Sequence, residues 1–420
     1  MRLRSTIILL AGTGLAGCAD QSDPTRPGPF ASPPGPPATL VIAPSQIGLV
    51  VGNHEHLSVF ASDATGRNTR VTPVWTSRDP DIASVNSSDG TVTAISEGIT
   101  TITATVDALR AEAKISVIDV AGTIAFTRMN YLGGHLTSDV LILAVGSGVL
   151  QQVTPPDQTS GLAAPTWSPN REQLALEVIH LDEQVPQSEG LDYSSDIYIY
   201  RPGGPTGAQW QPVTVNRRSR WPRWSPDGTR IAYVGPDTVP GLQQIYVVNV
   251  AGGAPVRLTS AAGWYTTPSW SPDGSRLTFS FWPSGDVGQS DVFIVTADGT
   301  GLTNVTRHPA YDGQPSWSPD GKRLAFVSDR NQPDNRTHIS DIFVIDVDGS
   351  NATSLTSFIG GGLRSVDGPV WSPDGRALAF VLHSPNIAEK IHVLRLGGSL
   401  MVGLTTPSQG AADFWPSWIR

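Results

Sequence analysis

Residues 315–329 read PSWSPDGKRLAFVSD: a Pro-x-Trp triplet, a Ser-Pro-Asp-Gly tetrapeptide and an apolar run. Four variants of this phrase begin at Pro165, Pro222, Pro268 and Pro369, and a shortened one, PSWIR, occupies residues 416–420. The six motif tryptophans are 57, 46, 47, 54 and 47 residues apart. A period of about 40 to 50 residues, with four strand signals in each period, predicts the blades of a β-propeller.

Each repeat divides into four expected strands. The Pro-x-Trp segment is the first, and the Ser-Pro-Asp-Gly turn leads to the second, because proline fixes φ and glycine accepts a positive φ. The third strand follows a variable loop, as in DIFVIDV at 341–347, and an Asp-Gly or Gly-Gly turn precedes the fourth. Five of the fourth strands run into a threonine: Thr214, Thr259, Thr306, Thr356 and Thr405.

The incomplete pieces at either end of the repeats complement each other. Residues 122–154 supply a second, third and fourth strand, and residues 416–420 supply only a first. An open ring would expose unpaired strand edges, which promote aggregation. We therefore expect a six-bladed propeller over residues 120–420, closed by its N- and C-terminal strands.

Residues 39–118 have a different pattern, with seven short β-branched runs between Gly, Asp, Asn and Pro. This pattern predicts a small β-sandwich. Asp89-Gly90 lies between two of the runs and predicts a hairpin turn, and Trp75 is expected in the core. The fold class is therefore all-β, an immunoglobulin-like sandwich followed by a propeller.

Both regions resemble known families. Residues 74–106 resemble a bacterial immunoglobulin-like domain of group 2 at Trp75, Ala83-Ser84-Val85, Gly90 and Gly98; members are commonly spacers or adhesion modules. The repeated phrase resembles the WD-like repeats of the TolB β-propeller family, which implies the propeller fold. TolB itself carries a different N-terminal domain, so the resemblance does not imply its role in the Tol-Pal system.

The N-terminus predicts export and lipidation. Arg2 and Arg4 precede a short apolar run at 7–10, as in a signal peptide over residues 1–18. Leu15-Ala16-Gly17-Cys18 resembles a bacterial lipobox, which implies a lipid on Cys18, the single cysteine; the alternative is an ordinary signal peptide with a chance cysteine. By resemblance to lipoprotein sorting, Ala19 after the cysteine favours the outer membrane, on its periplasmic or surface side.

Residues 19–38 are rich in proline and are expected to form an extended linker. No other segment is apolar for 18 residues, so we expect membrane attachment through Cys18 alone. Charged residues make up 15% of the chain and the net charge is −9, without a Lys/Arg-rich block. Nucleic acid is therefore not an expected partner, because binding to phosphates needs a concentrated basic face. We expect a monomer.

Antiparallel alternation places the loops between second and third strands, and those between fourth and first strands, on one face of the disc. The long loops belong to this set, at 179–195, 235–243, 281–290, 328–340 and 382–389. Elaborated loops on a regular scaffold predict function on that face, where Arg and aromatic side chains are common anchors. The candidate binding residues are Arg217, Arg218, Arg220, Trp221, Trp264, Tyr265, His308, Tyr311, Asp312, Asp367, Asp413 and Trp415.

Within this set, Trp264 and Tyr265 are expected to be exposed, whereas filling the end of the ring is an equal alternative for Trp221 and Trp415. The motif tryptophans are expected in the core between blades.

Three functions remain open. The leading hypothesis is a non-catalytic envelope module whose loop face docks a protein, peptide or glycan, without a cofactor. The alternative is a propeller lyase or hydrolase acting on a polysaccharide or peptide; its support is a set of face histidines that could hold a metal beside Asp312, Asp367 and Asp413. They are His135, His180, His308, His338 and His383. No Gly-x-Ser-x-Gly or His-Glu-x-x-His motif is present. A purely structural role, with no partner on the face, is the third.

Overall fold

The computed structural model describes residues 33–132, 135–153, 155–156, 160–180, 194–204, 209–239, 241–283, 290–331, 339–357, 365–384, 387–398, 400–408 and 410–419. The ordered elements in these ranges are all β-strands, which confirms the all-β prediction. The same ranges contain no helix of the length and apolarity needed to cross a membrane. The signal peptide, Cys18, His338 and most of the linker lie outside the described residues.

The N-terminal unit consists of three sheets, with strand orders β1-β4-β5, β2-β10-β9-β6 and β3-β8-β7. Its strands are β1 (Thr39–Ala43), β2 (Gln46–Val50), β3 (His54–His56), β4 (Ser58–Ser62), β5 (Asn68–Thr69), β6 (Val74–Ser77), β7 (Ala83–Val85), β8 (Thr91–Ala94), β9 (Gly98–Val106) and β10 (Leu109–Ile118). Trp75 is buried in its core, as expected. Gly90 has a φ of +76° and lies so close to the Trp75 ring that a Cβ atom would be 2.7 Å from it. The turn therefore requires glycine for both backbone and packing reasons.

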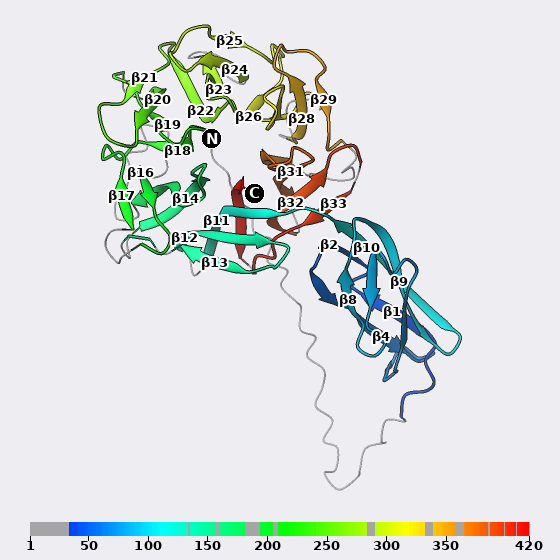
Figure 1. The fold of residues 1–420 in the computed structure, drawn as a ribbon. Helices are drawn as coiled ribbons and strands as arrows, with labels where there is room; N and C mark the ends of the chain where they lie inside the picture. The colour runs from blue at the N-terminus through cyan, green and yellow to red at the C-terminus, as the bar shows by residue number, and fades with distance from the viewer. Residues whose placement is uncertain are drawn as a thin grey trace, which may run out of the picture.

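The remaining strands form six four-stranded sheets in the described part of the chain, and Figure 1 shows these sheets around a central axis. They are β13-β12-β11-β34, β14-β15-β16-β17, β18-β19-β20-β21, β22-β23-β24-β25, β26-β27-β28-β29 and β30-β31-β32-β33. The bounds are β11 (Gly122–Leu132), β12 (His135–Val145), β13 (Leu150–Val153), β14 (Ser160–Trp167), β15 (Leu174–His180), β16 (Ser194–Tyr200), β17 (Trp210–Pro212), β18 (Arg220–Trp224), β19 (Arg230–Pro236), β20 (Gln243–Asn249), β21 (Val256–Arg257), β22 (Gly263–Trp270), β23 (Arg276–Pro283), β24 (Asp291–Thr296), β25 (Thr303–Asn304), β26 (Asp312–Trp317), β27 (Arg323–Ser328), β28 (Asp341–Asp346), β29 (Thr353–Ser354), β30 (Ser365–Trp371), β31 (Ala377–Ser384), β32 (Ile387–Arg395), β33 (Met401–Gly403) and β34 (Ala411–Ile419).

One sheet is built from both ends of the propeller sequence. Strand β34 pairs with β11 in antiparallel register, so that Ile124 lies opposite Trp418. The Trp418 indole N–H donates to the Ala121 carbonyl at 3.1 Å. The innermost strand of this sheet thus comes from the C-terminal end of the chain, and its other three strands from residues 122–153.

Hydrogen bonds explain why the same residues recur in the repeated phrase. In the turn at 225–230, the Ser225 hydroxyl and the Thr229 backbone N–H both donate to Asp227, at 2.5 and 3.0 Å. The hydrogen bond from Ser225 makes the largest contribution to the low Asp227 pKa, and together these hydrogen bonds lower it to about 2. The motif tryptophan links neighbouring blades, since the Trp270 indole N–H donates to the Arg223 carbonyl of the preceding blade at 3.1 Å. The phrase therefore specifies a turn and, at Trp270, Trp317 and Trp371, an indole hydrogen bond to the preceding blade.

The threonine after each fourth strand fixes the outer edge of the blade. Thr306 accepts a hydrogen bond from the Val292 backbone N–H at 3.1 Å and donates to Asp291 at 2.8 Å. Thr356 does the same with the Ile342 N–H and Asp341, both at 2.9 Å. A buried N–H without a partner is costly, which explains a hydroxyl at this position.

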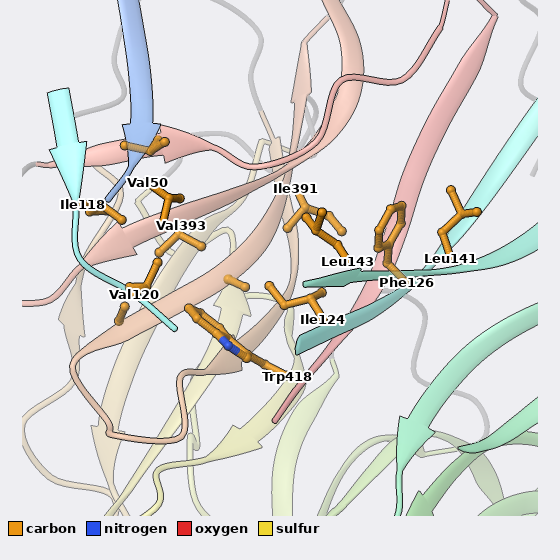
Figure 2. Close-up of a cluster of buried hydrophobic side chains, with 13 residues drawn as sticks. Val50, Ile118, Val120, Ile124, Phe126, Leu141, Leu143, Ile391, Val393 and Trp418 are labelled. Carbon is orange, nitrogen blue, oxygen red and sulfur yellow. The ribbon is translucent and has the colours of Figure 1, made fainter. Parts of the chain in front are cut away.

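The N-terminal unit packs directly on the propeller beside β33 (Figure 1). Val50, Ile118 and Val120 share a buried cluster with propeller residues that include Val393 and Trp418 (Figure 2). A Cβ at Gly48 would be 2.9 Å from a Val402 methyl, so close approach requires glycine there. At this seam the two units share a continuous apolar core, which a simple spacer would not need.

Candidate functional site

The innermost strand of every blade carries a β-bulge immediately before the motif proline. The pairing register shifts at this point in all six described inner strands, and the residue before the proline has a positive φ. The residue before a proline is disfavoured in the right-handed helical region, and bulges re-aim side chains and often lie beside functional sites. These residues are Ala164 (φ 46°), Trp221 (52°), Thr267 (49°), Gln314 (53°), Gly368 (59°) and Trp415 (48°).

Buried acceptors on the preceding blade hold several bulges in place. The Ala164 N–H donates to Thr127 at 3.0 Å, the Trp221 N–H to Glu177 at 2.7 Å, and the Gln314 N–H to Ser280 at 2.9 Å. All three acceptor residues are almost fully buried. A positive φ in a non-glycine residue costs about 1–3 kcal/mol and persists only when its surroundings enforce it. These polar contacts, together with the proline, supply that enforcement.

Five of the six bulge residues line one pocket of about 340 Å³ at the loop end of the ring. The sixth, Ala164, is buried in a small cluster against which Trp221 and Trp415 pack. Bulge residues and neighbouring ring-facing side chains form the wall: Trp221, Thr266, Thr267, Trp282, Tyr311, Gln314, Asp367, Gly368, Val381, Phe414 and Trp415. A ligand-sized concavity with aromatic walls and few polar groups is typical of a binding site.

One wall of the pocket carries a charged network. The His383 ring contacts Asp367 through Nε2 and Glu389 through Nδ1, both at 2.7 Å, while the Gln314 amide donates to Asp367 at 3.3 Å. Burial disfavours the charged imidazole, but hydrogen bonds to the two carboxylates outweigh burial and raise the His383 pKa to about 10. Both ring N–H groups therefore donate to carboxylates at neutral pH, and the three ionised side chains together carry one net negative charge.

Aromatic rings flank this network, and the Phe414 ring centroid is 6.0 Å from that of His383. The rings of Trp282 and Tyr311 are 5.6 Å apart, and those of Phe414 and Trp415 are 5.9 Å apart. Burial, with nearby carboxylates such as Asp367, raises the Tyr311 pKa above its usual range, so the phenol stays protonated. The pocket thus combines electron-rich ring faces with a carboxylate.

The network predicts a pH-dependent stability. Because the His383 pKa is about 10 when folded and 6.5 ordinarily, its contribution to the free energy of unfolding is complete below about pH 6.5 and is lost as the pH rises to 10. His383→Gln, which has no charge, should remove this component. Urea denaturation of both proteins between about pH 6 and pH 10 measures the difference, and an unchanged pH dependence in the variant would contradict the assignment.

Four of the twelve candidate binding residues meet in this pocket: Trp221, Tyr311, Asp367 and Trp415. Arg217 and Arg218 are exposed and lie between β17 and β18, outside the pocket. Trp264 is 37% exposed, as expected, but does not line the pocket. The His308 ring nitrogen Nδ1 accepts from the Ala310 N–H at 3.1 Å and lies outside the pocket as well.

The other four candidates are buried. Tyr265 was expected to be exposed, but it is buried. Its ring stacks on Phe281 with the ring centroids 4.4 Å apart, and its hydroxyl donates to the Ala261 carbonyl at 3.1 Å. Asp312 and Asp413 are fully buried, and Arg220 is 7% exposed. The correction has one cause: the first strand of each blade begins several residues before the motif proline, so residues expected in loops belong to strands.

The buried aspartates pair with arginines: Arg128 lies in the adjacent strand β11, and Arg330 lies two residues beyond the end of the adjacent strand β27. Asp413 accepts two hydrogen bonds from Arg128, at 2.7 and 2.9 Å, and Asp312 accepts one from Arg330 at 2.8 Å. Burial raises the Asp312 pKa, although Arg330 opposes the shift. Both carboxylates are therefore engaged within the propeller rather than presented to a partner.

Sequence reasoning missed Trp282, Gln314 and Glu389. The position just before each motif proline was an available signal for Gln314, because it is the one ring-facing position that the repeat marks. Of the face histidines, the described ring nitrogens of His180 and His383 contact carboxylates. Within the described ranges, no three His, Cys, Asp or Glu residues are grouped so that they could hold a metal ion. The side chain of His135 is not among those described.

The four-stranded sheets that the described residues form around a central axis are those of a β-propeller, and comparison with known proteins specifies its family. The family model of the TolB beta propeller domain matches residues 207–419, and that of the bacterial Ig-like domain (group 2) matches residues 39–117. The chain belongs to the TolB β-propeller family and carries a group 2 immunoglobulin-like domain.

Individual proteins are similar to this chain in fold or in part of their sequence. The TolB structure from Acinetobacter baumannii has a TM-score of 0.56 at 18% identity, with 71% of this chain and 66% of that chain covered. Kuenenia stuttgartiensis hydrazine synthase has a TM-score of 0.55 at 12% identity, covering 71% of this chain and 47% of that one. At these identities the likeness concerns the fold. An uncharacterised protein of Agrobacterium fabrum (strain C58 / ATCC 33970) is 34% identical over 185 residues, 43% of this chain and 60% of that protein. The chain thus spans less than two thirds of this curated relative.

Proposed function

We propose that this protein is a non-catalytic, lipid-anchored module of the bacterial cell envelope, and that the loop end of its propeller docks a protein, peptide or glycan. The observation that carries the proposal is the pocket built from five pre-proline bulges on five different blades. Positive-φ positions in non-glycine residues are costly, and five of the six pre-proline bulge residues line this pocket. Aromatic side chains that remain half-buried around such a pocket are typical interface anchors.

The anchor is a separate part of the proposal. It rests on the lipobox-like Leu15-Ala16-Gly17-Cys18 and on the proline-rich segment that follows. One acyl chain gives marginal binding, and several give firm attachment. We place the protein in the outer membrane as a monomer, with the propeller extended from the membrane by the linker.

The enzymatic alternative has less support. A metal-dependent lyase or hydrolase would need convergent ligands, and the described face histidines lie on separate blades, with His180 in β15, His308 before β26 and His383 in β31. Both ring nitrogens of His383 are occupied by carboxylates. A docking function needs no such convergence.

Site-specific photo-crosslinking in whole cells tests the docking proposal. A benzophenone amino acid in place of Trp282, in the pocket wall, is expected to form adducts with a partner of defined mass. The same amino acid in place of Lys322, in an exposed turn at the opposite end of the blade, is the matched control. Equal adducts from both positions, or none from Trp282, would remove the support for docking. In the same cells, fatty-acid label on the wild-type chain and none on C18S tests the anchor.

A further inference from the structure

The wall of the pocket is rich in aromatic residues. Five of its wall residues are aromatic and come from four separate segments: Trp221 in β18, Trp282 in β23, Tyr311 before β26, and Phe414 with Trp415 in β34. The chain has twelve tryptophans, six of them in the repeated motif. Of the other six, three line this pocket. Tryptophan is therefore concentrated here beyond what blade packing requires.

The charge of the wall has a single sign. Among the described residues that line the pocket there is one carboxylate, Asp367, and no Lys, Arg or His. The Asp367 side chain is 40% exposed, and its partner His383 is 23% exposed. Since His383 is shared between Asp367 and Glu389, it compensates one of the two negative charges. The remaining negative charge disfavours an anionic ligand in the pocket.

Ring faces carry negative electrostatic potential, and cations bind over them, most strongly over tryptophan. A neutral ligand would use the rings but leave the excess negative charge of the Asp367–His383–Glu389 network uncompensated. We propose that the pocket binds a small organic cation, an ammonium or guanidinium group, enclosed by the rings of Trp221, Trp282 and Trp415 and paired with Asp367. The inference gives the ligand chemistry of the site proposed above and rests on that assignment of the site.

The ammonium or guanidinium group can belong to a free organic cation or to a basic side chain of a partner protein. Both have a cationic head that fits a cavity of about 340 Å³, and aromatic pockets recognise methylated ammonium groups through the same interaction. A titration with probes of each kind separates the two sources.

The test is a ligand-observed NMR titration of the detergent-solubilised full-length protein with choline and with 3,3-dimethylbutan-1-ol, its uncharged isostere. Choline methyl signals should move upfield saturably, because the ligand lies over ring faces, and choline should bind at least about tenfold more tightly than the alcohol. Nα-acetylated lysine and arginine amides form the second arm. Tighter binding of these amides than of choline indicates a partner's side chain, and the reverse indicates a free cation.

Variants separate the charge from the rings. Asp367→Asn, which keeps the shape of the side chain and removes its charge, should weaken choline about tenfold and leave the alcohol unchanged. Trp282→Ala should weaken both and reduce the upfield shift. Phe60→Ala, which truncates an exposed ring of the N-terminal unit, should change neither. Equal affinity for choline and the alcohol, or full choline affinity in D367N, would overturn the proposal. That result would leave the crosslinking experiment unaffected, so the two can fail separately.

Discussion

Trp418→Ala is expected to lower the free energy of unfolding by about 3–5 kcal/mol, the range measured for truncating buried aromatic side chains. Trp418 is 7% exposed and lies in the cluster that joins β34, β11 and the N-terminal unit (Figure 2). Its truncation removes the packing of three parts of the fold at once, and it also leaves the Ala121 carbonyl without its indole donor. The effect should therefore fall in the upper part of that range.

Urea denaturation followed by circular dichroism measures this loss as a shift of the midpoint. Trp264→Ala is the matched control, because Trp264 is 37% exposed and belongs to none of the buried clusters that the structure describes. Its truncation should cost less than about 1 kcal/mol. Equal midpoints for the two variants would show that the pairing of the two chain ends contributes little to stability.

Asp413→Ala is the second large effect, a loss of about 3–5 kcal/mol expected for breaking a buried ion pair. The Asp413 side chain is completely buried and lies opposite Arg128 in the register of β11 and β34. Removing it leaves the Arg128 guanidinium without its counter-charge. Since the Arg128 side chain keeps 18% exposure and can be partly hydrated, we expect the lower end of the range.

A double variant without either charge tests the contribution of the pair. Arg128→Met combined with Asp413→Leu removes both charges. This double variant should be more stable than D413A, because it leaves no unpaired guanidinium in the closing sheet. A double variant that is less stable than D413A would mean that the pair itself stabilises the closing sheet. Binding at the pocket should persist in the folded fraction of D413A, since Asp413 does not line it.

The sequence predicted what depends on neighbouring residues. A turn such as Ser225–Arg230 is specified by proline, aspartate and glycine within six positions, and its hydrogen bonds form locally. The core position of Trp75 and the role of the motif tryptophans follow from the same strand patterns. The β-bulges could not be predicted from the motif prolines, because a residue before proline can also lie in a regular extended strand.

The candidate site was predicted in part. Trp221, Tyr311, Asp367 and Trp415 were named and line the pocket, whereas Tyr265, Asp312 and Asp413 are buried. The second group departs from the prediction because the first strand of each blade begins earlier in the sequence than the motif proline. Alternation of burial along β26 and β34 places Asp312 and Asp413 on the inner side of the sheet, and a boundary shift of a few residues changes a loop contact into a core residue.

The sequence by itself determined the number of repeats, the turns between strands and the residues that lock one blade to the next, because each is encoded within one period of the phrase. Only the tertiary structure decided which side chains meet in the channel and which charges are paired. Arg128 and Asp413 are 285 residues apart, and Trp221, Trp282 and Trp415 come from three different blades. The arrangement of the blades brings such residues together, and a local sequence pattern contains no information on which distant residues will be in contact.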